Sequence, residues 1–149
     1  MGDKTEVIVY CPEVFKHKVQ SILKRYDSLQ HLPRHFVLFY VEEVNYEELD
    51  EKEDLLIKAG IPCDFRWGEG DTYSAGTTSI RFTEEGELDI KSFSDNQLSI
   101  SIGLLMEDID NYEKLKNLIL GCNEAITALP WDNQIEYSNI YLMKRLISG

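Results

Sequence analysis

The chain has 149 residues, a formal net charge of −12 and a hydrophobic content of 43%, which fit one folded acidic domain spanning residues 1–149. An aromatic content of 11% argues against a disordered acidic tail, because such tails are poor in aromatic side chains. So large an excess of negative charge also disfavours direct binding to nucleic acid or to an anionic membrane, since both need a basic footprint.

Targeting and membrane signals are not apparent in the sequence. No apolar run approaches the roughly 20 residues that a membrane-spanning helix needs. The first residues lack the apolar segment of a secretory signal peptide. Three widely spaced cysteines, Cys11, Cys63 and Cys122, predict reduced thiols rather than a disulfide framework. We therefore expect a cytoplasmic protein.

The negative charge is concentrated in the middle of the chain. Residues 1–41 carry six Lys or Arg and four Asp or Glu, whereas residues 42–71 carry three and eleven. Residues 72–149 carry six and twelve. An acidic block beside a slightly basic N-terminal third predicts a surface for a basic partner, most simply another protein.

The first 44 residues predict a strand, a helix and a second strand. The β-branched run 5–10 is typical of a strand, and apolar residues at helical spacing from Val14 to Tyr26 predict a helix. The nearly continuous apolar run that begins at Phe36 and ends at Val44 predicts a central strand covered on both faces.

A second helix is predicted over residues 46–59, with Asn45 as its N-cap. Asn45 and Glu48 have the spacing of a capping box at its beginning, and Gly60 suits its end. We expect its outer face to be acidic, with the candidate binding residues Glu47, Asp50, Glu51 and Asp54. The simpler interpretation is that this face only keeps the protein soluble.

Beyond Pro62 the pattern changes to a period of two, with turn residues between short segments. This pattern predicts four strands, at 63–67, 73–83, 88–93 and 97–106. The sequence leaves open whether the Ser- and Thr-rich face of these strands, which includes Thr77 and Ser79, meets solvent or a second copy of the chain.

The C-terminal region is predicted to be mainly helical. Asp110 and Glu113 have capping-box spacing, and residues 131–147 fit a helix, although alternation there also permits a strand. An apolar helical stripe is formed by Tyr112, Leu115, Ile119, Cys122 and Ile126. The element order β-α-β-α-β-β-β-β-α-α predicts an α+β fold: a mixed, largely antiparallel sheet of five to six strands with helices packed on one side.

The densest group of chemically versatile side chains lies in the segment 64–73. Its candidate binding residues are Asp64, Arg66, Trp67, Glu69, Asp71 and Tyr73. Together with the acidic helix, they predict one continuous anionic surface with aromatic anchors, Trp67 and Tyr73, at its margin. The first hypothesis is therefore a small binding or regulatory module that engages a basic macromolecular surface.

The same segment supports an alternative, a small enzyme or ligand-binding domain with its pocket under the loop. Asp64 and Glu69 would then act as acid, base or metal ligands. Arg66 would hold an anion and Tyr73 would position the ligand. A third interpretation is a polar hairpin tip whose glycines serve the turn.

Two other chemistries have weaker support. Cys11 precedes a predicted helix that begins at Pro12, where backbone N–H groups can stabilise a thiolate, although a packed, unreactive thiol is the simpler interpretation. The histidines, His17, His31 and His35, are not spaced as metal ligands. Nucleotide-binding and hydrolase motifs are lacking, so no cofactor is predicted.

Overall fold

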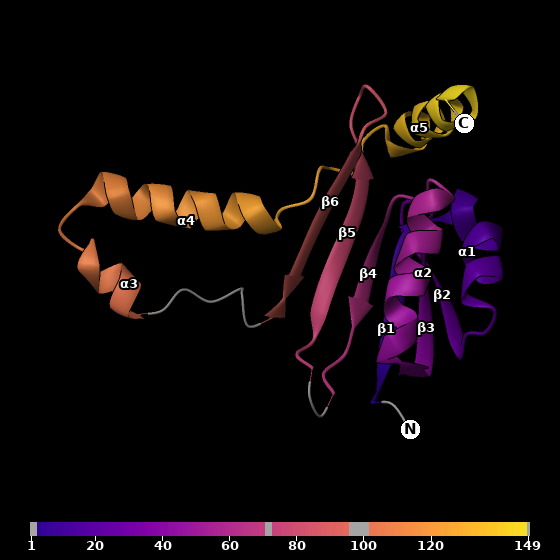
Figure 1. Ribbon diagram of the computed structural model, residues 1–149, viewed down its shortest axis with the longest axis horizontal. Helices are drawn as coiled ribbons and strands as arrows, with labels where there is room; N and C mark the ends of the chain where they lie inside the picture. Colours follow the sequence, from indigo (N-terminus) through magenta and orange to yellow (C-terminus); the bar gives the residue numbers. More distant parts are fainter. Residues whose placement is uncertain (1–2, 71–72, 96–101, 149) are drawn as a thin grey trace.

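The structure is a computed structural model that describes residues 3–70, 73–95 and 102–148 (Figure 1). The strands of the described chain are β1 (Lys4–Pro12), β2 (Ser28–Leu32), β3 (Phe36–Asn45), β4 (Cys63–Trp67), β5 (Gly76–Phe82) and β6 (Leu88–Ser94). The helices are η1 (Glu13–Phe15), α1 (Lys16–Leu23), α2 (Tyr46–Lys58), α3 (Ile102–Glu107), α4 (Tyr112–Ile126) and α5 (Gln134–Ser148). The predicted α+β class is confirmed.

The six strands of the described chain form one sheet in the order β2-β3-β1-β4-β5-β6, and every neighbouring pair is antiparallel. The long strands β1 and β3 lie inside this sheet, and their apolar runs bury every second residue on one face. The prediction that β3 is covered on both faces is wrong. The strand belongs to an antiparallel sheet whose helices pack on one face, so only its alternate residues are fully buried.

The hydrophobic core lies between the sheet and the helices α1 and α2, which cover one face of it (Figure 1). Val9, Phe39 and Phe65 project from the three central strands, and Val19 of α1 and Leu56 of α2 pack from the helical side. Each of these side chains is fully buried, and burying one contributes about 1.5–3 kcal/mol. The opposite face of the sheet, which we call the open face, carries the alternate residues of the same strands.

We call the sheet with α1, α2 and α5 the body, and α5 covers one end of it. Tyr141 packs against Phe82, with ring centroids 4.8 Å apart. The buried amide of Gln134 accepts from the Phe82 backbone N–H at 2.8 Å and donates to its carbonyl at 2.9 Å. The side chain thus replaces a neighbouring strand at this residue. Gly60, which ends α2 with a positive φ of 68°, leaves room for Leu142.

Helices α3 and α4 project away from the sheet on the side of β6 (Figure 1). We call residues 102–126 the arm. Neither α3 nor α4 has a buried residue in the described chain. All the other helices contribute at least one buried side chain, so the arm differs in kind from the rest of the fold.

Two elements of the N-terminal half differ from the sequence prediction. The first α-helix ends at Leu23, because Lys24 adopts a positive φ of 66° that no helix continues. The strand β2 was not predicted, because it is a short edge strand with polar side chains. Arg34 and His35, both with positive φ, form the tight turn that joins it to β3.

In the C-terminal half, the predicted strand 97–106 is wrong over residues 102–106, which are helical. Its first residues, 97–101, lie outside the described residues. Helix α4 begins one residue later than predicted, since Asn111 is the N-cap and its side chain accepts from the Lys114 N–H. The ambiguous segment 131–147 is helical from Gln134 onwards.

Candidate functional site on the acidic helix

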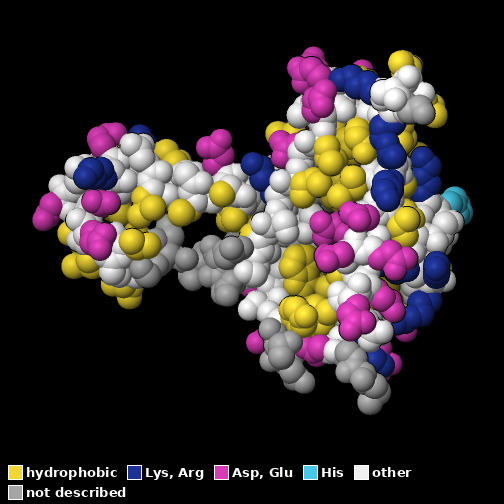
Figure 2. Space-filling model, viewed as in Figure 1, with side chains coloured by type: hydrophobic (Ala, Val, Ile, Leu, Met, Phe, Trp, Pro, Cys, Tyr) yellow, Lys and Arg dark blue, Asp and Glu magenta, His cyan; other side chains and the backbone are white. Residues whose placement is uncertain are grey.

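The outer face of α2 carries a row of exposed carboxylates. Leu49 and Leu56 turn the opposite side of the helix into the core. The four predicted binding residues then share one exposed face, at the helical spacing i, i+3, i+4 and i+7: Glu47, Asp50, Glu51 and Asp54. We call these four residues the acidic stripe. Figure 2 shows acidic side chains gathered over α2, with basic side chains over α1 beside them.

The acidic stripe is not neutralised. Among the described residues, no Lys or Arg forms an ion pair with any of its four carboxylates. Glu47 lies four residues before Glu51, and Asp50 four before Asp54, so like charges are neighbours on the helix. Each such pair costs a few tenths of a kcal/mol. The stripe therefore opposes folding slightly, and a cationic partner would relieve this repulsion.

Glu53 shows that the stripe also affects its neighbours. Its half-buried carboxylate accepts from the Thr78 hydroxyl at 3.2 Å, at the core side of α2. Burial raises the pKa of Glu53, and the charges of Asp50 and Asp54 raise it further, while the Thr78 hydrogen bond lowers it.

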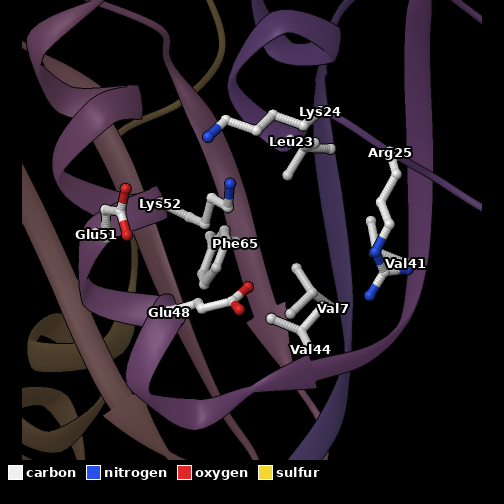
Figure 3. A pocket seen from close by; sticks show the side chains of 10 residues that line it. All are labelled: Val7, Leu23, Lys24, Arg25, Val41, Val44, Glu48, Glu51, Lys52 and Phe65. Carbon is white, nitrogen blue, oxygen red and sulfur yellow. The ribbon is translucent and has the colours of Figure 1, made fainter.

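A cleft of about 330 Å³ lies between α1 and α2, next to the stripe (Figure 3). Its floor is apolar and consists of Val7, Leu23, Val41, Val44 and Phe65. Its walls are charged and carry Lys24, Arg25, Glu48, Glu51 and Lys52. Glu51 belongs to both the cleft and the stripe, so the two are continuous.

Two of the cations in this cleft are already used by the backbone. Lys52 donates to the carbonyl of Ile22 at 3.0 Å, at the C-terminal end of α1. Arg25 donates to the carbonyls of Glu42 and Glu43 at 2.7 and 3.2 Å. Lys52 thus links α2 to α1, and Arg25 links the segment after α1 to β3. Neither contact uses the carboxylate of Glu51, which remains available to a ligand.

One aromatic residue of the predicted loop meets the beginning of α2. Tyr73 stacks on Tyr46, with ring centroids 4.2 Å apart, and remains 52% exposed. The Tyr46 hydroxyl donates to the carbonyl of Gly68, which ties the loop to the helix. Trp67 is instead partly buried against the core and donates to the Ser74 carbonyl at 3.0 Å. The structure thus brings Tyr73, but not the indole of Trp67, to the acidic stripe as an exposed aromatic side chain.

The predicted single anionic surface is wrong for Asp64, which lies on the open face of the sheet. Residues alternate between faces along a strand, so Asp64 and Arg66 point away from the buried Phe65 and from α2. Asp64 forms an ion pair with Arg81 at 2.9 Å. It is thus separated from the stripe by the sheet, and its charge is balanced.

The other loop residues do not join Asp64 in one pocket. Arg66, Trp67 and Glu69 line a shallow depression of about 240 Å³ that also includes Glu6. Tyr73 lies at α2 instead. Asp71 lies outside the described residues. The arrangement required by the alternative hypothesis, with Asp64, Glu69 and Tyr73 around one ligand, is therefore not formed.

Arg81 is a key residue that the sequence analysis missed. Its side chain is 3% exposed, lies 3.5 Å from the centre of the Trp131 ring and donates to the Leu129 carbonyl at 3.0 Å. It thereby fixes the segment before α5 to the open face. The available signal was a charged residue between Ile80 and Phe82 in an apolar strand, since a buried charge requires a partner.

The structure contradicts a reactive Cys11. Its side chain is fully buried in β1, and burial raises its pKa to about 12, which is the opposite of thiolate stabilisation. His31 and His35 lie 3.5 and 3.8 Å from the carboxylate of Glu13, a convergence that their spacing did not indicate. In the described part of the chain, no group of three or more His, Cys, Asp or Glu side chains could hold a metal ion.

No protein-family model matches the chain, and neither the curated proteins nor the solved structures gave a match. Within the described residues, none of the helices combines the length and the apolar character that crossing a membrane would require.

Proposed function

We propose that this protein is a binding module that docks a basic surface of another protein onto the acidic stripe of α2. The observation that supports this proposal is that four exposed carboxylates share one helix face and have no ion-pair partner among the described residues. Elsewhere in the described chain, Asp64 is paired with Arg81 and Glu87 with Lys144. An unbalanced row on a rigid helix suits charge recognition.

The surroundings of the stripe favour a protein as the partner. Tyr73 offers an exposed aromatic ring at the N-terminal end of α2, and aromatic side chains are common anchors in protein interfaces. The cleft offers an apolar floor beside Glu51. This floor suits an apolar side chain of the partner, since the cleft walls already carry the cations Lys24, Arg25 and Lys52. The free thiols agree with the cytoplasmic location expected from the sequence.

The test compares two variants that remove the same number of charges. The first neutralises the stripe by Glu47→Gln, Asp50→Asn, Glu51→Gln and Asp54→Asn. The matched control neutralises four acids of the arm by Glu107→Gln, Asp108→Asn, Asp110→Asn and Glu113→Gln. Partners are captured from the native cell extract at low salt and quantified by mass spectrometry, with the wild type alongside.

A partner of the proposed kind is basic, binds the wild type and the control alike, and is reduced at least about tenfold by the stripe variant. Its binding also weakens as salt is raised, because salt screens exposed charges. The proposal is refuted if every captured protein binds the stripe variant as well as the wild type, or if none is captured. Urea unfolding serves as the folding control, and the stripe variant should be at least as stable as the wild type.

A further inference from the structure

The arm carries an apolar seam that the rest of the described chain covers only in part. Its residues on α4 are spaced alternately three and four apart: Tyr112, Leu115, Ile119, Cys122 and Ile126. This is the a/d spacing of helices that pack on one another in coiled coils. Tyr112 is 70% exposed and Ile119 46% exposed, although such a seam is normally buried against a second helix.

A helix of this kind needs a partner to be stable. Isolated helices of about 12–15 residues are marginal in water, and most of their stability in proteins comes from packing an apolar face. Helix α4 has 15 residues and α3 has six, and neither buries a side chain within the described structure. The surface that stabilises the arm must therefore be supplied from outside the described chain.

The exposed apolar area of the arm fits a small dimer interface. Its large, exposed apolar side chains, apart from Leu120 on the other side of α4, are Ile102, Leu104, Met106, Ile109, Tyr112 and Ile119. A fully exposed side chain of this size offers on the order of 100 Å² of apolar surface, and these are about half to three quarters exposed, so together they offer roughly 350 Å² per copy. About two thirds of a homodimer interface is apolar, so this area corresponds to an interface of roughly 500 Å² per copy, at the small end of stable interfaces.

We infer that the arm pairs with the arm of a second copy of this chain, with the two α4 helices antiparallel about a two-fold axis near Ile119. The spacing of the seam supports self-pairing, because it reads nearly the same in both directions from Ile119, so each apolar residue meets another across the axis. Glu113 and Glu124 lie on the side of α4 away from the seam, so their charges do not face one another.

The antiparallel direction follows from where the arm is attached. The sheet lies at the C-terminal end of α4 (Figure 1). Parallel helices would bring the two bodies, each strongly acidic, to the same end of the pair. Antiparallel helices place them at opposite ends, about 20 Å apart along the helix axis. The dimer interface uses residues other than the acidic stripe, so its formation can be tested independently of binding to the proposed partner.

Sedimentation equilibrium of the full chain tests the dimer. The wild type is expected at about twice the mass of one chain, and Ile119→Glu at the mass of one, because two charges would be buried against each other at the axis. The control Asn117→Glu adds the same charge on the opposite side of α4 and is expected to remain dimeric. The dissociation constant should rise at least about 100-fold for Ile119→Glu alone.

Other results would overturn the inference. A wild type that stays monomeric at high micromolar concentration contradicts it, as does a dimer that both variants leave intact. Salt separates this contact from the proposed partner interface, since an apolar seam persists or strengthens at high salt. Near-ultraviolet circular dichroism of Ile119→Glu checks that the body remains folded, which is expected because Ile119 is not among the described residues that form the core or pack against it.

The direction of the helices has its own test in Cys122. In parallel helices the two Cys122 residues would face each other and form a disulfide under mild oxidation. In antiparallel helices they are displaced along the axis and lie across an interhelical distance of about 8–10 Å, beyond disulfide reach. We expect no disulfide-linked dimer, and its rapid formation would overturn the antiparallel arrangement.

Discussion

The helices α2 and α4 are similar in length and amphipathic character, yet α2 buries its apolar side chains and α4 leaves most of them exposed. In α2, Leu56 is fully buried against the sheet, whereas in α4, Ile119 of the apolar seam is 46% exposed. The difference lies in what each helix can reach: α2 lies across one face of the sheet, while α4 projects to the side of it, with only its C-terminal end near the sheet (Figure 1). An apolar stripe therefore predicts that one face of a helix is covered, but it does not identify the surface that covers it.

The largest expected contrast between body and arm is in thiol reactivity. In the Ile119→Glu variant, where the arm is free of a second copy, Cys122 should be alkylated at the rate of an exposed thiol. Cys11 and Cys63 are buried, and burial raises the pKa of both, so they should react at least about 10³-fold more slowly, only when the body unfolds. Timed alkylation with mass spectrometry measures the three rates.

Urea is the control for this experiment, since all three thiols should react alike once the chain is unfolded. Fast labelling of Cys11 in the folded protein would show that β1 opens locally. It would remove the sharp division between a rigid body and an exposed arm.

A matched pair of truncations gives the next largest contrast. Leu56→Ala opens a cavity in the core and should lower the free energy of unfolding by about 3–5 kcal/mol. Leu120→Ala removes the same atoms from an exposed site away from the seam and should change it by less than about 0.5 kcal/mol. Urea unfolding followed by circular dichroism measures both. A comparable loss in the two variants would mean that α4 is packed as tightly as α2.

The body could be predicted from the sequence more fully than the arm. The strand β1 was identified because a β-branched run with one buried face is a local signal. The helix α2 was identified because its cap, its stripe and Gly60 agree. By contrast, residues 102–106 are apolar at nearly every position, so no period separates a strand from a helix there.

The candidate site was predictable only where it depends on one helix. The spacing of Glu47 and Asp54 on a single helix face follows from the helical period alone. The position of Asp64 depends on Arg81, which lies on the neighbouring strand β5 and 17 residues further along the chain. It also depends on Trp131, which packs against Arg81. Such contacts arise from tertiary packing, so no local pattern indicated that Asp64 would leave the acidic surface.

The smallest expected effect concerns the charge that α2 carries toward the core. The pKa of Glu53 is raised above its ordinary 4.5, first by burial and then by Asp50 and Asp54, so the folded protein holds this proton more tightly than the unfolded chain. The stabilisation from protonation is therefore complete below pH 4.5 and is lost as the pH rises through the folded pKa. Glu53→Gln keeps an acceptor for the Thr78 hydroxyl and removes the charge.

We expect Glu53→Gln to be more stable than the wild type at pH 7, by less than about 1 kcal/mol because the carboxylate is only half buried. The difference should shrink as the pH falls toward 4.5, where the wild-type carboxyl becomes neutral as well. Urea unfolding at several pH values measures it, with the exposed Glu124→Gln of the arm as the matched control, for which no such trend is expected. A stability difference that does not depend on pH would mean that Glu53 is solvated like an acid of the arm. In that case neither burial nor the charges of Asp50 and Asp54 would destabilise the ionised Glu53 in the folded protein.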